Sequence, residues 1–193
     1  SFPTRRSSDL DPNVQHILPQ LERRVITYGT HTQAFYRLTE PSFEGFSSSF
    51  TMHRNGDSLG RVTINVPGPH NCLNALAALA TAMELGVGFE AARAGLAAFK
   101  GVQRRAQVRG EAAGIVVMDD YGHHPVEIKK TLEALKNGFP ERRLVAIFQP
   151  HRYSRTRDLF SEFVKSFYDA ASLYVTEVYA ASEDPIPGVS GQS

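Results

Sequence analysis

The sequence predicts an α/β protein in two successive parts: strands with two helices, followed by the start of a doubly wound parallel sheet. Three observations lead to this fold class. Residues 34–66 show strand-like alternation, the apolar spacing becomes helical from Asn71, and strand-like and helix-like segments alternate from Gly114 onward. Alternation of single strands with helices is the pattern of a parallel β-α-β-α-β sheet covered by helices.

The first part begins with a short helix and a strand. Asp11 followed by Pro12 predicts a helix over 11–21, because Asp is a favoured N-cap and Pro is tolerated at the first helical position. A strand is expected over 23–29, and the Asn-Gly-Asp turn at 55–57 predicts a hairpin. The other expected elements of this part are strands at 34–40, 45–54 and 60–66 and helices at 71–86 and 89–101.

The second part alternates between strands and helices up to a glycine- and proline-containing end. Its predicted strands are 114–121, 142–150 and 172–178, and its predicted helices are 125–138 and 156–170. The polar, basic stretch at 105–110 separates the two parts and gives domains of 11–105 and 106–193. Because a parallel sheet of three strands is short, we expect this sheet to be truncated at its C-terminal side.

Composition narrows the function classes. The chain has 193 residues, of which 41% are apolar and 21% charged, as in soluble globular proteins. A net charge of +1 gives no global attraction to nucleic acid or to a membrane surface. Cys72 is the single cysteine, which excludes an internal disulfide and fits a reducing, cytoplasmic setting. A phosphate-binding loop of the form GxxxxGK[ST] is absent from the sequence.

Two predicted strand ends carry dense groups of polar side chains. The groups are Asp119, Asp120, Tyr121, His123 and His124 after the first strand, and His151, Arg152, Arg155 and Arg157 after the second. Ligands of an open parallel sheet bind beyond the carboxyl ends of its strands. Arginine binds carboxylates, and a carboxylate or imidazole receives an ammonium group, so a pocket for a small zwitterion is predicted. The alternatives are solvated loop residues, a zinc site formed by the first group's histidines and an aspartate, or a phosphate held by the arginines.

A smaller polar group lies at the start of the helix predicted from residue 71. His70, Asn71 and Asn74 stand there, and the two asparagines share a helix face because they are three residues apart. They are either an ordinary cap with a polar first turn or an amide pair that contacts a nucleotide. Arg104 and Arg105 are likewise either solvated hinge residues or a phosphate contact.

Five motifs, taken in their order, resemble the Mur ligase family. They are HNCLNALAA, FKGVQRR, DDYGHHPVEI, FQPHRYSRTRDL and EVYAASEDPIPG, and the resemblance runs from Asp11 to the C-terminus. DYGHHP followed by QPHRYSRTRD is typical of the alanine-adding branch of that family. The resemblance implies a bacterial cytoplasmic ligase of peptidoglycan synthesis that uses ATP and Mg²⁺ to join L-alanine to UDP-N-acetylmuramate through an acyl phosphate.

The resemblance also implies roles for individual residues. Asn71 and Asn74 match nucleotide-contacting amides with His70 beside them, and Arg105 and Asp120 match a catalytic pair that reaches ATP. The L-alanine pocket is matched by Tyr121, His123, Arg152 and Arg155. No metal ligand is assigned to this chain.

The same resemblance implies that the chain is a fragment. Residues 11–105 correspond to the end of a central ATP-binding domain, and residues 106–193 to the first part of a Rossmann-like, amino-acid-binding domain. The family's phosphate-binding loop, magnesium-binding glutamate and UDP-substrate domain are expected before Asp11, so we expect this chain alone to be inactive as a ligase. The alternative is a stand-alone, non-catalytic α/β module that binds an amino acid or a small anion.

The first ten residues, SFPTRRSSDL, do not fit this scheme. They are the translation of a widely used short-read sequencing adapter, so we expect residues 1–10 to be a non-native segment rather than a basic targeting arm. Removing their two arginines and one aspartate leaves equal numbers of basic and acidic residues.

Overall fold

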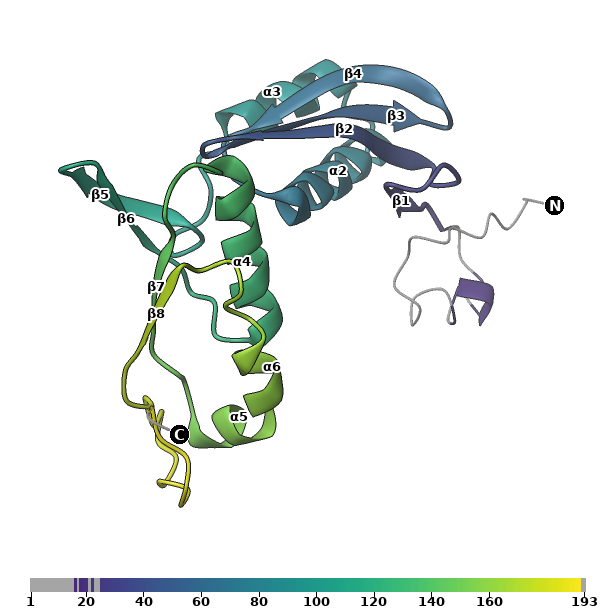
Figure 1. Ribbon diagram of the computed structural model, residues 1–193. Helices are drawn as coiled ribbons and strands as arrows, with labels where there is room; N and C mark the ends of the chain where they lie inside the picture. Colours follow the sequence, from purple (N-terminus) through teal and green to yellow (C-terminus); the bar gives the residue numbers. More distant parts are fainter. Residues whose placement is uncertain (1–15, 17, 21, 23–24, 192–193) are drawn as a thin grey trace. The chain divides into compact units, whose positions relative to one another are not determined.

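The computed structural model describes residues 16, 18–20, 22 and 25–191, and the chain divides into two compact units, Ser1–Lys100 and Gly101–Ser193 (Figure 1). Both units combine helices with strands, and the sheets include parallel and antiparallel pairs, so the predicted α/β class is confirmed. Across the described residues, no helix combines the length and apolar character needed to cross a membrane. The adapter-like residues 1–10 and the helix start expected at Asp11 and Pro12 lie outside the described residues.

The first unit is a four-stranded sheet with two helices. The strands are β1 (Tyr28–Gly29), β2 (Tyr36–Glu44), β3 (Ser47–Arg54) and β4 (Asp57–Ile64), in the order β1-β2-β3-β4. β1 is parallel to β2, and the other pairs are antiparallel. The predicted hairpin is confirmed, because Asn55 and Gly56 both have a positive φ between β3 and β4, as a tight two-residue turn requires. Ahead of the sheet, among the described residues of the expected 11–21 helix, His16 is helical and Leu18–Gln20 form the short 3-10 helix η1.

Helix α2 (Pro69–Glu84) packs against β2 and β3, and α3 (Phe89–Ala98) packs against β4 (Figure 1). The sequence predicted a start of α2 at residue 71, but the helix begins two residues earlier. Pro69 fits the first helical position because its fixed φ suits a helix and its missing N–H has no intrahelical partner there. The end of α3 also differs from the prediction: the helix stops at Ala98, because Phe99 turns to an extended backbone.

The core of the first unit lies between the sheet and α2. Alternate residues of β3 are buried, including Phe50 and Met52, and they meet Leu76 and Leu79 from one face of α2. Cys72 belongs to the same core, and its burial raises the pKa of the thiol to about 11. This cysteine is therefore a protonated packing residue at neutral pH.

The second unit begins with an antiparallel hairpin of β5 (Gln107–Ala112) and β6 (Ile115–Asp119). β5 corrects the prediction that this stretch is only a polar connection between domains. Ala113 and Gly114, with φ of 50° and 76°, form the turn that folds β5 back onto β6. Within the described residues β6 bonds to β5, while β7 (Val145–Phe148) and β8 (Ser172–Val175) form the parallel pair.

Helices connect these strands. α4 (Pro125–Gly138) occupies the predicted bounds, with Pro at its first position. The helix predicted over 156–170 instead starts at Tyr153 and is divided at Leu159 into α5 (Tyr153–Asp158) and α6 (Phe160–Val164), because Leu159 departs from helical dihedral angles. Ile128 and Leu132 of α4 pack with Phe163 of α6 and form the core of this unit.

Two leucines of α2 provide a matched test of the first unit's core. Leu76 is fully buried, whereas Leu85 at the C-terminal end of the same helix is 80% exposed. Leu76→Ala is expected to lower the free energy of unfolding by about 2–5 kcal/mol, because it removes packed methyl groups and leaves a cavity. Leu85→Ala is expected to change it by less than about 0.5 kcal/mol. Denaturant unfolding of both variants measures the difference, and equal losses would contradict this packing.

Candidate functional site

The loops after β6 and β7 bring their aromatic and imidazole side chains together. The ring centroids of His123 and His151 lie 6.2 Å apart. Tyr121 meets the His123 ring edge-on at 5.0 Å, and Tyr179 lies 5.4 Å from His151. The four side chains therefore form a row of rings, in which Tyr121 and His123 follow β6, His151 follows β7 and Tyr179 follows β8 (Ser172–Val175).

Two arginines, Arg152 and Arg155, lie near His151. Arg155 places Nη1 3.4 Å from both the Nδ1 atom and the backbone oxygen of His151. Because a guanidinium only donates, Nδ1 of His151 accepts in this contact. Burial lowers the pKa of His151, and the positive charges of Arg155 and Arg152 lower it further. This imidazole is therefore neutral at pH 7 and does not repel a second cation.

The backbone at Arg152 has an unusual conformation. Its φ of 75° is rare for a residue with a side chain, and its N–H donates to the Tyr179 carbonyl at 2.8 Å. Glu183 accepts from the Ser154 N–H at 2.9 Å and from the Ser154 hydroxyl at 2.6 Å. The same carboxylate lies 3.9 Å from the Arg152 guanidinium. The Ser154 hydroxyl and N–H lower the pKa of Glu183, so the carboxylate stays charged beside Arg152.

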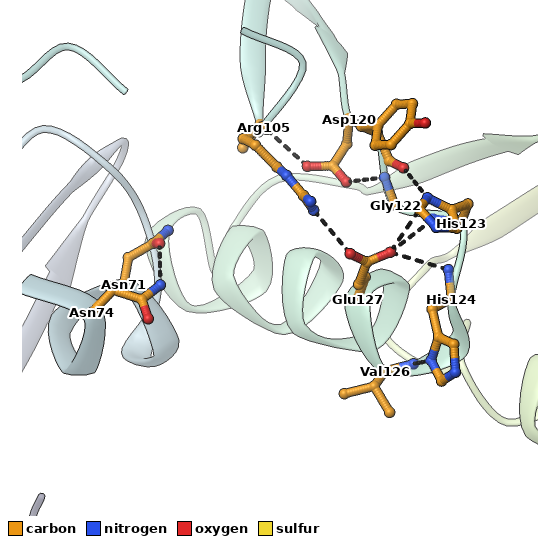
Figure 2. Close-up of polar contacts among 11 residues, drawn as sticks. Asn71, Asn74, Arg105, Asp120, Gly122, His123, His124, Val126 and Glu127 are labelled. Atoms are coloured by element: carbon orange, nitrogen blue, oxygen red, sulfur yellow. Dashed lines mark hydrogen bonds and ion pairs between the residues drawn. The ribbon is translucent and has the colours of Figure 1, made fainter. Parts of the chain in front are cut away.

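Asp120 connects the start of the hairpin to the turn that follows it (Figure 2). One carboxylate oxygen accepts from the Ala106 N–H at 2.8 Å, and the other accepts from the Gly122 N–H at 2.7 Å. A Cβ atom at Gly122 would lie only 2.7 Å from the Asp120 oxygen, so the turn requires glycine. Beside this connection, the Tyr121 N–H donates to the Arg104 carbonyl at 2.6 Å.

Arg104 and Arg105 both face the Tyr121 ring, with guanidinium carbons 5.1 Å and 5.9 Å from its centroid. Their partners differ, because Arg104 pairs with Asp119 and Arg105 pairs with Glu127, each at 3.2 Å. The structure thus holds Arg105 within the same unit as Asp120, although the two side chains contact different groups.

His123 and His124 have separate structural roles. His123 Nδ1 donates to the Tyr121 carbonyl at 3.0 Å, which leaves Nε2 as the acceptor of the neutral ring. His124 is the N-cap of α4, and its Nδ1 accepts from the Val126 N–H at 3.4 Å (Figure 2). No metal-binding group of three or more His, Cys, Asp or Glu residues occurs in the part of the chain that the structure describes. The arrangement therefore does not favour the zinc alternative.

In the first unit, His70, Asn71 and Asn74 lie in the first two turns of α2. Asn71 donates to the Pro67 carbonyl at 2.8 Å and accepts from the Asn74 amide at 3.3 Å (Figure 2). The N-cap of this helix is Gly68 and not Asn71. The two amides are therefore joined to each other on one helix face, at the end that presents free backbone N–H groups.

Arg157 is the member of the predicted cluster that the structure does not bring to it. Its guanidinium pairs with the adjacent Asp158 at 2.7 Å on the exposed side of α5. Sequence reasoning did not identify Glu127 and Glu183, although each lies within a motif that was recognised. Glu at the third position of a helix that follows a polar cap was the available signal for Glu127.

Comparison with known proteins adds independent information. Residues 8–82 match the Mur ligase middle domain, and residues 104–193 match the Mur ligase glutamate ligase domain. The UDP-N-acetylmuramate–L-alanine ligase of Trichlorobacter lovleyi is 55% identical over 94% of this chain, and that of Geobacter sulfurreducens is 54% identical over the same share. The chain spans only about 40% of the length of these relatives.

Solved structures agree with these matches. The UDP-N-acetylmuramate–alanine ligase of Thermotoga maritima is 34% identical, with a TM-score of 0.71 over 80% of this chain and 34% of its own. The MurF ligase of the same organism is 21% identical, with a TM-score of 0.67 over 86% of this chain and 38% of its own, and it shares the fold. Matches to two successive Mur ligase domains, high identity to ligases and a shared architecture lead to one conclusion: the chain belongs to the Mur ligase family.

Proposed function

We propose that this chain is part of an ATP-dependent ligase that joins L-alanine to UDP-N-acetylmuramate. The observation that carries the proposal is the convergence of His123 and His151 with Arg152 and Arg155 where two strands end. Relatives that are 50–55% identical over nearly the whole chain are named as ligases of this substrate pair, which supports the same assignment. We place the reaction in the bacterial cytoplasm, where ATP is available.

The domain assignment follows from the same proposal. Residues 11–105 are assigned to the end of the central ATP-binding domain, and residues 106–193 to the first part of the amino-acid-binding domain. The two compact units and the residue ranges of the two family matches support this division. Residues 1–10 remain assigned to a non-native segment.

L-Alanine is assigned to the loops after β6 and β7. Arg152 and Arg155 bind its carboxylate, because a guanidinium forms paired, charge-assisted hydrogen bonds with a carboxylate. Tyr121 and His123 take the ammonium side, where the free Nε2 of His123 accepts a proton from the amine. A zwitterion suits this pair of environments, since one side is cationic and the other offers a neutral acceptor.

The nucleotide is assigned to four polar residues and an adjacent histidine. Asn71 and Asn74, with His70 beside them, supply amides at the start of α2, and Arg105 and Asp120 are also assigned to the nucleotide. The substrate carboxylate attacks the terminal phosphorus of ATP, which forms an acyl phosphate and releases ADP. The alanine amine then attacks the acyl carbon, phosphate leaves, and the amine loses a proton. Arg105 is assigned to stabilise the charge that develops on the phosphoryl oxygens.

Magnesium, when bound, neutralises charge on the transferred phosphoryl group in reactions of this type. The described residues contain no group of three or more His, Cys, Asp or Glu side chains suited to a metal. The proposal assigns no magnesium ligand to this chain, and its own residues are assigned to bind and orient the amino acid and the nucleotide.

The activity is tested by transplanting the segment. Residues 11–191 replace the matching part of the Trichlorobacter lovleyi ligase, and phosphate release is followed with ATP, UDP-N-acetylmuramate and L-alanine. The chimera is expected to show alanine-dependent release, whereas the isolated 193-residue chain is expected to show none because it spans about 40% of the relatives' length. A chimera that folds, by circular dichroism and thermal melting, but has no activity contradicts the proposal.

Two arginines of α5 give a matched test of the alanine pocket. In the active chimera, Arg155→Ala is expected to raise the KM for L-alanine about 10–100-fold, because a charge-assisted hydrogen bond to a carboxylate contributes about 1.5–3 kcal/mol. The KM for ATP is expected to change less than about twofold. Arg157→Ala is the control, since the Arg157 guanidinium pairs with its neighbour Asp158 on the exposed side of α5. Equal effects of the two substitutions would remove Arg155 from the pocket.

The lowered pKa of His151 predicts a specific acid sensitivity of the second unit. The unfolded chain binds a proton at His151 near pH 6.5, whereas the folded chain binds it only at lower pH, so folding stability declines as the pH falls below about 6.5. His151→Gln is expected to reduce this decline, and the exposed His16→Gln is expected to retain it. Denaturant unfolding of the 193-residue chain at pH 7.5 and 5.5 gives the comparison. An unchanged decline in His151→Gln would show that His151 is not its source.

A further inference from the structure

Glu127 contacts residues of both proposed ligand sites within the second unit (Figure 2). Its Oε1 atom lies 3.2 Å from Nη1 of Arg105. Its Oε2 atom accepts from the backbone N–H groups of His123 and His124, at 3.1 Å and 3.2 Å, and lies 3.6 Å from Nδ1 of His123. One carboxylate therefore touches the arginine assigned to the nucleotide and the histidine assigned to alanine.

The position of Glu127 in α4 explains how it reaches both. It is the third residue of the helix, and its side chain turns back to the N-cap residue His124 in a capping box. Glutamine also serves at this position of a capping box, because an amide oxygen accepts the same backbone N–H bonds. The negative charge is thus not needed for the cap, and its particular partner is the Arg105 guanidinium.

The charge is present at neutral pH. Burial alone raises the pKa of Glu127, but the N–H groups of His123 and His124 and the Arg105 guanidinium outweigh it and lower the pKa. The contact with Arg105 is therefore a charge-assisted hydrogen bond between two half-exposed side chains.

The contacts also close into a circuit. Arg105 lies 5.9 Å from the centroid of the Tyr121 ring, and that ring packs edge-on against His123 at 5.0 Å. Glu127 joins the two ends, because it bonds both to Arg105 and to the His123 segment. Arg105 and His123 are therefore linked by two sets of contacts, one through Tyr121 and one through Glu127.

We propose that Glu127 is a positioning residue that holds Arg105 and His123 in a fixed relation and so links the nucleotide side of the reaction to the amino-acid side. The inference rests on the proposed ligase function. Glu127 itself contacts neither substrate, and it acts through Arg105 and the backbone of the loop after β6.

The kinetic test uses the chimera described above and two substitutions on one helix. Glu127→Gln keeps the cap and removes the charge, and it is expected to lower kcat/KM about 10–100-fold because Arg105 loses its fixed position. Glu133→Gln removes the same charge from the exposed Lys130–Glu133 pair and is expected to stay within about twofold. In an Arg105→Ala background, Glu127→Gln is expected to add less than about twofold. A full additional loss in that background, or no loss in the parent chimera, overturns the proposal.

A second measurement separates this proposal from the ligase function. In the ¹⁵N-labelled 193-residue chain, Glu127→Gln is expected to shift the side-chain Nε–H resonance of Arg105, whereas Glu133→Gln leaves it in place. An inactive wild-type chimera would contradict the ligase function, while an unshifted Arg105 resonance overturns the role of Glu127 whether or not the chimera is active. A shift together with the predicted non-additive kinetics supports both.

Discussion

The arrangement of the second unit depends on the carboxylate of Asp120. Its two oxygens accept hydrogen bonds from the backbone N–H groups of Ala106 and Gly122. Ala106 directly precedes β5, and Gly122 lies three residues after the end of β6. These bonds join the two open ends of the hairpin and direct the chain into α4. Without the Asp120 carboxylate, these two partly buried backbone N–H groups would lose their hydrogen-bond acceptor. Each unsatisfied N–H group lowers folding stability by about 1–3 kcal/mol. The places of Tyr121 and His123 follow from this turn, because both residues lie within it.

Glu127 and Glu183 make the same kinds of contacts at the two strand ends. Each accepts backbone N–H groups at the start of a helix and lies beside an arginine of the preceding segment, Arg105 or Arg152. The carboxylate replaces hydration for the N–H groups, and these N–H groups together with the arginine keep the carboxylate ionised. Such an arrangement holds the long, flexible arginine side chain in place while the guanidinium stays exposed and charged. Some of its N–H donors therefore remain available to a ligand.

The sequence specified elements with clear local signals better than those that need partners. The bounds of α4 were predictable because Pro125 suits a first turn and Gly138 suits a helix end. β5 was not recognised, since its only strongly apolar residue is Val108 and its pairing with β6 depends on the turn at Ala113. Predicting Leu159 as helical failed for a similar reason, because the break there has no Gly or Pro to signal it.

The residues of the proposed site also differ in how well they could be predicted from the sequence. The histidines and arginines after β6 and β7 were identifiable, because strand ends of a parallel fold are a general location for ligands. Arg157 was predicted within the cluster by proximity in sequence, and in the structure its guanidinium pairs with the adjacent Asp158. Glu183 was not identifiable from position alone, because its contact with Ser154 spans 29 residues.

In the proposed alanine pocket, the electrostatics favour the reactive form of the substrate. Burial lowers the pKa of His151, and the positive charges of Arg155 and Arg152 lower it further. The same charges act on an ammonium group bound nearby, while they attract the carboxylate of the same molecule. Only the free amine has the lone pair that attacks an acyl phosphate, so cationic surroundings that bind the carboxylate also promote loss of the ammonium proton. The His123 ring, whose Nδ1 donates to the Tyr121 carbonyl, presents Nε2 as its acceptor for that proton. Under the proposed function, binding and activation of alanine are two consequences of one charge distribution.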